Sequence, residues 1–204
     1  MLEIICATGN KSKLQEIRDL LHDLPVMLSS LVDYWNPVPA IPETGCTFLE
    51  NALQKAAWVI EKNVGRKGLI GVLADDSGLE VDALGGRPGV RSARFAGENA
   101  DVEANNKKLL ELLADVPSER RTARFKCIAV LMACDKSYFS AEGICEGTIA
   151  FSPRGAGGFG YDPLFVPVGF SRTFAELTPE EKHAISHRGK ALENVKRYYY
   201  ELIG

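Results

Sequence analysis

The sequence lacks the patterns that mark disulfide-rich, zinc-binding or membrane-spanning proteins. Its five cysteines are an odd number, and no Cys-x-x-Cys pair occurs, which argues against a disulfide framework and against a zinc site. No apolar run approaches the roughly 18 residues that a membrane span requires. Residues 1–7 carry no basic segment ahead of their apolar stretch, so we expect no signal peptide. Because Cys6, Cys127 and Cys134 lie in apolar surroundings, we expect reduced, buried thiols in a cytoplasmic protein.

An excess of basic charge is also lacking. Lys and Arg number 24 against 27 Asp and Glu, which gives a net charge of -3. This balance argues against nucleic acid or an anionic membrane as a partner. A small anionic substrate remains compatible with it, because a few local basic residues are enough to bind one. The length of 204 residues, without a repeat or an obvious linker, suits one domain or one domain with two lobes.

Two adjacent acids follow a short apolar run in the chain. Residues 69–74 predict a strand that is buried on both faces, and Asp75 and Asp76 come directly after it. Ligands bind outside the carboxyl ends of strands in open α/β sheets. Neighbouring buried carboxylates repel each other, so they need a metal ion, a proton or basic partners. Two interpretations remain open: a Mg²⁺-dependent phosphate site, or an acidic turn in which Asp75 caps a backbone group and Asp76 is solvated.

The first strand leads into a second candidate site. Residues 8–10 (Thr-Gly-Asn) predict a turn, and residues 11–21 predict an amphipathic helix with Asn10 as N-cap. The backbone amides and dipole of a helix N-terminus attract phosphate, and Lys11 and Lys13 add positive charge. The segment is not a Walker A loop, because it lacks the second glycine. The alternative is an ordinary turn with solvated lysines.

A proline-containing loop, residues 31–46, ends in Glu43-Thr44-Gly45. Thr47 and Glu50 then form a capping box at the start of a helix that reaches about residue 63. If this loop lies near the strand ends, Glu43 joins the acid pair as a third carboxylate. Carboxylate oxygens together with phosphate oxygens suit octahedral Mg²⁺, but the sequence does not fix that proximity.

The second half of the chain supplies a glycine-rich segment and a polar helix start. Glycines flank Phe159 and Tyr161 within residues 152–163, so the backbone can approach a flat ligand and a ring can stack on a nucleobase; the alternative is a turn with buried aromatic residues. His187 and Arg188 open the last helix, where the dipole disfavours positive charge. This conflict favours a functional role, although His187 is alternatively a solvated imidazole.

The other elements that the sequence predicts are a strand at residues 25–30, a helix at 101–113, a long β-hairpin with strands 120–134 and 137–151, and a helix that begins at Thr178. The length of the hairpin suggests a second lobe or a dimer surface. Arg91 and Arg94 are expected to form solvent-exposed ion pairs rather than phosphate contacts.

Together these segments resemble one family, the inosine triphosphate pyrophosphatases, also called Ham1-like proteins. The matching segments are residues 7–13, 43–52, 74–79, 88–94, 157–163 and 186–189. Each motif alone is weak, but their order and spacing along nearly the whole chain make the set highly specific. The resemblance implies an α/β fold with an elongated mixed β-sheet and flanking helices. It also implies one domain, residues 1–204, with two lobes around a central active-site cleft, usually as a homodimer.

The resemblance further implies an activity: hydrolysis of ITP, dITP and XTP at the α-phosphorus to the monophosphate and pyrophosphate, with Mg²⁺, which cleanses the nucleotide pool. Asp76 would be the general base and a metal ligand, and Glu43 a second metal ligand. The implied substrate-binding residues are Thr8, Gly9, Asn10, Lys11, Ser12, Lys13, Ser77, Phe159, Gly160, Tyr161, Asp162, Lys182, His187 and Arg188. Residues 8–13 would cradle the triphosphate, residues 159–162 would enclose the base, with Phe159 stacking on it, and Lys182, His187 and Arg188 would reach the base edge or the phosphates.

One position departs from the family pattern. Many members carry a second acid directly before the glutamate of Glu-Thr-Gly, whereas this chain has Pro42. Glu43 therefore has no acidic neighbour in the sequence.

Base discrimination is expected at the purine 6-position. Inosine and xanthosine present an oxo acceptor there, which a donor such as Arg188 satisfies, whereas adenine presents an amino donor. Exclusion of GTP must depend on the surroundings of its 2-amino group, for which the sequence indicates no residue. The alternatives are a pyrophosphatase with another nucleotide preference, such as a modified pyrimidine, and a non-catalytic nucleotide sensor on the same fold.

Overall fold

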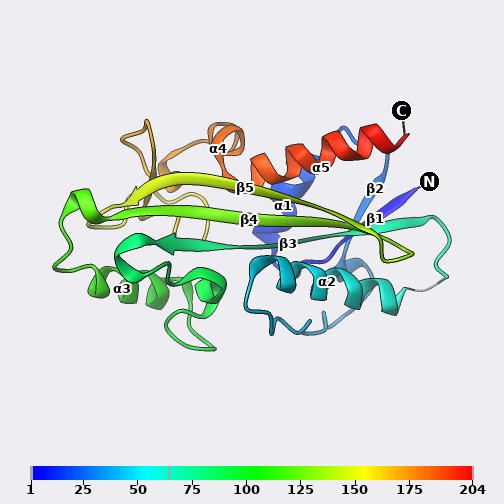
Figure 1. Ribbon diagram of the computed structural model, residues 1–204, viewed down its shortest axis with the longest axis horizontal. Helices are drawn as coiled ribbons and strands as arrows, with labels where there is room; N and C mark the ends of the chain where they lie inside the picture. The colour runs from blue at the N-terminus through cyan, green and yellow to red at the C-terminus, as the bar shows by residue number, and fades with distance from the viewer. Residues whose placement is uncertain (1, 64, 204) are drawn as a thin grey trace. The chain divides into compact units, whose positions relative to one another are not determined.

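A computed structural model describes residues 2–63 and 65–203 of the chain (Figure 1). Its strands form one six-stranded sheet in the order β2-β1-β3-β4-β5-β6. The strands are β1 (Glu3–Cys6), β2 (Met27–Ser30), β3 (Leu69–Val81), β4 (Thr122–Ala133), β5 (Tyr138–Ile149) and β6 (Phe165–Pro167). Because β1 pairs in parallel with β2 and β3 whereas β5 pairs antiparallel with β6, the sheet is mixed, as predicted.

Helices flank this sheet, which confirms the α/β class. The α-helices are α1 (Lys11–Leu20), α2 (Phe48–Lys62), α3 (Val102–Leu112), α4 (Pro179–Ile185) and α5 (His187–Ile203). The predicted caps are confirmed: Asn10, Thr47 and Thr178 each accept a backbone N–H of the first helical turn. No helix among the described residues is both long enough and apolar enough to cross a membrane.

The chain divides into two compact units. The first contains residues 1–76, 127–143 and 188–204, and the second contains residues 77–126 and 144–187. The long strands β3, β4 and β5 each contribute residues to both units. That the two units form one domain around a central cleft stays a prediction.

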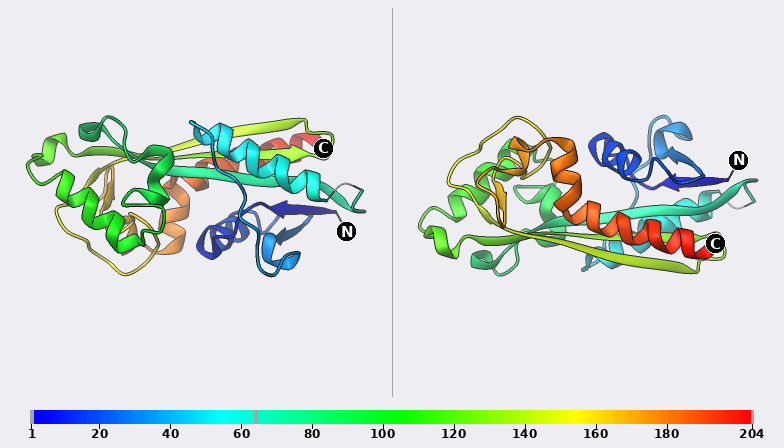
Figure 2. Two further views of the ribbon diagram at one scale, coloured as in Figure 1. Left: turned by 90° about the horizontal axis from the view of Figure 1, so that it is seen from below. Right: turned by 90° about the horizontal axis from the view of Figure 1, so that it is seen from above.

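In the first unit, helices cover both faces of the sheet. Alternate strand residues point to opposite faces, and two apolar clusters follow this alternation. Ile4 and Leu73 pack with α1 and α5, whereas Ile5 and Val72 pack with α2. Figures 1 and 2 show α5 and α2 on opposite sides of the strands. The second unit has a core of its own, in which α3 packs on an aromatic group that includes Phe125, Phe165 and Phe174.

The position of the acid pair in its strand differs from the prediction. β3 does not end before Asp75 but continues to Val81, so both acids lie within the strand. The strand that ends here is β1, whose last residue Cys6 is paired with Leu73. The acids thus lie just beyond the carboxyl end of β1, the neighbouring parallel strand, which is still the ligand-binding edge of such a sheet.

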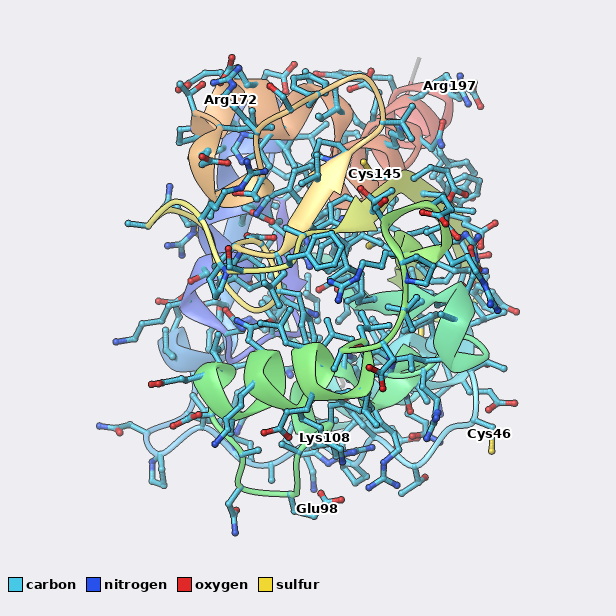
Figure 3. All side chains as sticks on the ribbon, turned by 90° about the vertical axis from the view of Figure 1, so that its left-hand side faces the viewer. Cys46, Glu98, Lys108, Cys145, Arg172 and Arg197 are labelled. Carbon is cyan, nitrogen blue, oxygen red and sulfur yellow. The ribbon has the colours of Figure 1, made fainter. Side chains whose placement is uncertain are left out.

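All five cysteines are free thiols. Burial is confirmed for Cys6 and Cys127 but is wrong for Cys134, which is exposed because it follows the last residue of β4 at the hairpin turn. Of the other two thiols, Cys145 is buried and Cys46 is exposed, and the side chain of Cys46 projects from the surface in Figure 3.

Candidate active site

Asp75 and Asp76 point to opposite faces of β3, because successive residues of a strand alternate. Asp75 lies on the face covered by α1 and α5. Its Oδ2 is 3.1 Å from Lys13 Nζ and 3.2 Å from Arg188 Nη2, and its side chain is 1% exposed. Burial alone would raise the pKa of Asp75, but Lys13, Arg188 and Lys55 outweigh burial and hold that pKa well below its usual range. Asp75 is therefore a fixed negative charge.

Ion pairs offset the unfavourable position of the positive Arg188 side chain at the N-terminus of α5. Its guanidinium is buried and forms ion pairs with Asp75 of β3 and with Glu16 of α1. Burial alone would lower the pKa of Arg188, but these two carboxylates raise it above its ordinary value. The structure thus places Arg188 in a charge network of the first unit, with its guanidinium held on two sides.

Asp76 faces α2 instead. Its Oδ2 accepts a hydrogen bond from Asn51 Nδ2 at 2.9 Å, and its Oδ1 lies 3.4 Å from Lys55 Nζ. The same Lys55 ammonium is 3.3 Å from Glu43 Oε1, so Glu43 and Asp76 approach one cation. Burial raises the pKa of Asp76 in spite of Lys55, Lys13 and the Asn51 hydrogen bond. Since Asp76 is 6% exposed, the alternative of a solvated acidic turn is wrong.

Sequence reasoning missed Asn51 and Lys55 as site residues. Both lie on the buried face of α2, on the side of the helix that also carries Ala52 and Ala56. Two polar residues spaced four apart within an apolar helix face were the available signal. Burial alone would lower the pKa of Lys55, but Asp76, Asp75 and Glu43 together raise it.

The donor set suits a divalent cation that is shared with a ligand. Within residues 2–63 and 65–203, no group of three or more His, Cys, Asp or Glu side chains is arranged to hold a metal ion. Glu43 and Asp76 nevertheless both lie against the Lys55 ammonium, so two carboxylates converge on one positive charge. Mg²⁺ is commonly held by one or two carboxylates, with phosphate oxygens and waters completing its shell. The two carboxylates fit that pattern.

The turn before α1 differs in detail from the predicted phosphate cradle. Asn10 Oδ1 accepts hydrogen bonds from the amides of Ser12 and Lys13, at 2.9 and 3.1 Å. Thr8 Oγ1 accepts the amide of Asn10. Two of the expected anion donors therefore bond to the cap, and the charge of Lys13 is directed at Asp75. Gly9, Asn10, Lys11 and Ser12 are exposed.

In the second unit, the glycine-rich segment is organised by Asp162. Its buried Oδ2 accepts hydrogen bonds from the amide of Phe159 and from Lys182 Nζ, both at 2.8 Å. Lys182 Nζ also lies 4.8 Å from the centre of the Phe159 ring. Gly160 has φ +64°, a left-handed conformation that favours glycine, and its carbonyl accepts a hydrogen bond from Asn106. Phe159 is thus a half-buried ring on a tightly fixed loop.

The remaining predicted residues are also placed. Tyr161 is buried and donates to the carbonyl of Ser92, so this aromatic residue is part of the core. His187 is buried and stacks on Phe125, with ring centres 4.7 Å apart, so the solvated alternative is wrong.

Ser77 directly follows Asp76 in β3 and belongs to the second unit. Arg91 forms a surface ion pair with Glu98, as predicted.

The predicted site residues therefore form two groups. The first unit brings together the turn before α1, Glu43, Asp76 and Arg188, with Asn51 and Lys55 added. The second unit brings together Phe159, Asp162 and Lys182. One group carries acids and cations suited to phosphate chemistry, and the other carries a ring on a glycine loop.

The model of the Ham1 family matches residues 4–198. The chain belongs to the Ham1 family. It is 50% identical over 196 residues to a dITP/XTP pyrophosphatase of Geobacter sulfurreducens, a match that covers 96% of each protein. It is 47% identical over 204 residues to a dITP/XTP pyrophosphatase of Geobacillus kaustophilus, covering 100% of this chain and 97% of that protein.

Solved Ham1 structures share the fold. A Ham1 protein from Coxiella burnetii superposes with a TM-score of 0.84 at 44% identity, covering 98% of this chain and 100% of that one. The Ham1 protein of Staphylococcus aureus gives a TM-score of 0.83 at 36% identity and covers 98% of each chain. These matches confirm the family that the sequence motifs indicated.

Proposed function

We propose that this chain hydrolyses purine nucleoside triphosphates with a non-standard base, namely ITP, dITP and XTP, to the monophosphate and pyrophosphate. The observation that carries the proposal is the opposite environment of two adjacent carboxylates, Asp75 and Asp76. Paired titratable groups whose surroundings push their pKa values apart mark acid–base sites. Relatives of nearly equal length are dITP/XTP pyrophosphatases, which supports the substrate class.

Asp76 is the general base in this proposal. Burial raises its pKa, so it binds a proton more readily than an ordinary aspartate. A water oxygen attacks the α-phosphorus while Asp76 takes a proton from that water. The bond between the α-phosphorus and the oxygen that bridges to the β-phosphate breaks. That oxygen leaves with the pyrophosphate, and the nucleoside monophosphate remains.

Mg²⁺ is the proposed cofactor, held by Asp76 and Glu43. When bound, it neutralises charge on the phosphates and on the leaving pyrophosphate. The chain's own residues supply the rest. Lys13 and Lys55 carry positive charge beside the acids. Thr8, Gly9, Asn10, Lys11, Ser12 and Lys13 are the proposed triphosphate-binding segment, and Ser77 is a proposed substrate contact.

Phe159, Gly160, Tyr161 and Asp162 are the residues that we propose to enclose the base, whereas Lys182, His187 and Arg188 are proposed to reach the base edge or the phosphates. Phe159 is the stacking ring, because Asp162 and Lys182 fix its loop. Donors directed at the purine 6-position would donate hydrogen bonds to the oxo group of inosine and xanthosine, whereas the amino group of adenine is itself a donor and would leave them without an acceptor. Arg188 would serve as a donor held by Asp75 and Glu16 rather than as a mobile side chain.

The test is pyrophosphate release from dITP, with ATP and GTP in parallel, with and without Mg²⁺. Wild type is compared with Asp76→Asn. We expect metal-dependent turnover of dITP far above that of ATP and GTP, and its loss in the variant. Equal turnover of all three nucleotides would contradict the specificity. No turnover by folded wild type would contradict the activity and favour a nucleotide sensor.

We also propose a cytoplasmic homodimer in which residues 1–204 form one functional domain. Sedimentation equilibrium of the 22.3 kDa chain distinguishes monomer from dimer directly. A monomer mass across the concentration range would contradict the dimer and leave the proposed chemistry untouched.

A further inference from the structure

Asn51 is a fully buried side chain that joins two parts of the candidate site. It is 0% exposed. Its Oδ1 accepts a hydrogen bond from the backbone amide of Gly45 at 2.8 Å. Its Nδ2 donates to Asp76 Oδ2 at 2.9 Å. One amide thus links the Glu-Thr-Gly loop to the carboxylate in the middle of β3.

The orientation of this amide is fixed by chemistry. A backbone N–H can only donate, so the Asn51 atom that faces Gly45 must be the carbonyl oxygen. The amino group then faces Asp76, whose ionised carboxylate can only accept. The flipped orientation would set two donors against each other at Gly45 and two acceptors against each other at Asp76. Only one orientation satisfies both neighbours.

The loop is pressed against α2 at this point. A Cβ added to Gly45 would lie 2.6 Å from Glu50 Cβ and 2.8 Å from Asn51 Oδ1. Glycine is therefore needed for the approach that lets Asn51 reach the loop backbone. Glu43 lies two residues before Gly45, and Lys55 lies one helical turn after Asn51.

We propose that Asn51 is a positioning residue that holds the Asp76 carboxylate and the Glu43 loop in a fixed mutual arrangement. With Asp76 Oδ2 anchored to Asn51, Oδ1 is directed at Lys55 Nζ, which Glu43 also contacts. The inference rests on the proposed function, because it assigns Asn51 a role through Asp76 as the base. It adds a residue that acts through its hydrogen bonds to Asp76 and to the Gly45 backbone.

Two variants separate the two hydrogen bonds. Asn51→Leu has a similar volume and removes both of them. Asn51→Asp keeps an acceptor for the Gly45 amide but replaces the donor that faces Asp76. Gln54→Leu is the matched control, because Gln54 lies on the same helix and accepts the Thr44 amide of the same loop at 3.0 Å. No hydrogen bond of Gln54 to Asp76 or Glu43 is found among the described residues.

Three quantities are measured for each variant: kcat and KM for dITP, the dissociation constant of a non-hydrolysable dITP analogue, and hydrogen exchange of the Gly45 amide. We expect kcat to fall about 10–100-fold in both Asn51 variants, as for other residues that orient metal-site ligands. KM and analogue binding should stay within about threefold of wild type. Gly45 exchange should accelerate in Asn51→Leu and stay slow in Asn51→Asp. Gln54→Leu should keep the wild-type kcat.

The outcomes are distinct from those that test the activity itself. Wild type without dITP turnover would contradict the proposed function, and Gly45 exchange would still report whether Asn51 fixes the loop. Wild-type kcat in either Asn51 variant would overturn the positioning role. An equal fall in Gln54→Leu would overturn it in favour of simple loop tethering. If Asn51→Leu does not fold, kcat and Gly45 exchange of Asn51→Asp decide the question alone.

Discussion

Asp75 and Asp76 are neighbours in the chain and are both buried, yet their surroundings shift their pKa values in opposite directions. The difference arises from strand geometry, which turns one side chain toward α1 and α5 and the other toward α2. On the first face, Lys13 and Arg188 contact Asp75 closely. On the other face, Asp76 shares Lys55 with Glu43 at longer distances. The pKa of Asp75 is therefore lowered by its basic partners, whereas burial raises the pKa of Asp76.

Removal of Lys55 should destabilise the protein, because Lys55 is the cation that Asp76 and Glu43 share on the α2 face. Lys55→Met would leave Asp76 and Glu43 without their shared cation. We expect a loss of about 3 kcal/mol in the free energy of unfolding, typical of a buried ion pair that loses one partner. Because Mg²⁺ would replace the missing charge, its addition should stabilise Lys55→Met more than wild type. Urea unfolding with and without Mg²⁺ measures this, with Lys55→Arg as control. Equal Mg²⁺ effects on Lys55→Met and wild type would contradict a metal site at Glu43 and Asp76.

Asn106 should affect nucleotide affinity rather than the chemical step. Its Nδ2 donates to the Gly160 carbonyl at 3.0 Å and so supports the loop that carries Phe159. Asn106→Leu should raise KM for dITP about fivefold, which corresponds to about 1 kcal/mol for one hydrogen bond. Asn105→Leu is the control, because Asn105 bonds to Ala93 and Ala96 outside that loop. Steady-state kinetics of both variants measure KM for dITP. An unchanged KM in Asn106→Leu, or an equal rise in both variants, would refute the role of Asn106 in supporting this loop.

At the scale of single elements, local chemistry sets where each helix begins. Asn10 caps α1 and Thr47 caps α2, and both were predicted from residues within three positions of the cap. The length of β3 was not predicted, because an Asp-Asp-Ser-Gly sequence has low intrinsic strand propensity. The buried ion pairs of Asp75 and Asp76 offset that preference once the neighbouring helices are in place.

Two substitutions of Asn10, the N-cap of α1, distinguish its effect on helix stability from its effect on anion binding. Asn10→Ala should lower the free energy of unfolding by about 1 kcal/mol, because Ser12 and Lys13 lose their acceptor. Asn10→Asp should keep that stability, since a carboxylate also caps a helix, but its negative charge should raise KM for dITP. Urea unfolding and steady-state kinetics measure the two effects. A wild-type KM in Asn10→Asp would show that this turn does not bind the triphosphate.

At the scale of the whole molecule, the stability of the fold at low pH can be tested independently of the candidate active site. Glu3, at the start of β1, accepts hydrogen bonds from Ser29, Tyr34 and Arg66. Burial alone would raise the pKa of Glu3, but these partners outweigh it and lower that pKa. A lowered folded-state pKa gives stability that is present above the unfolded pKa of about 4.3 and is lost as pH falls through the folded value.

Wild type should therefore lose more stability than Glu3→Gln when the pH falls from 7 to 3. The variant cannot ionise at this position, so the difference in free energy of unfolding between the two proteins should shrink toward low pH. Urea unfolding at several pH values measures this difference. A gap that stays constant with pH would refute the contribution of the ionised Glu3.

The sequence by itself determined the family, the class of sheet, the helix starts and the adjacency of two acids. Each of these depends on residues close together in the chain, or on motifs in a fixed order. Only the tertiary structure decided which charges meet. Arg188 lies 113 positions from Asp75, and Asn51 and Lys55 look like ordinary helix residues until α2 packs against β3. A cap is satisfied within one helical turn, whereas the partner of a buried charge depends on the path of the whole chain.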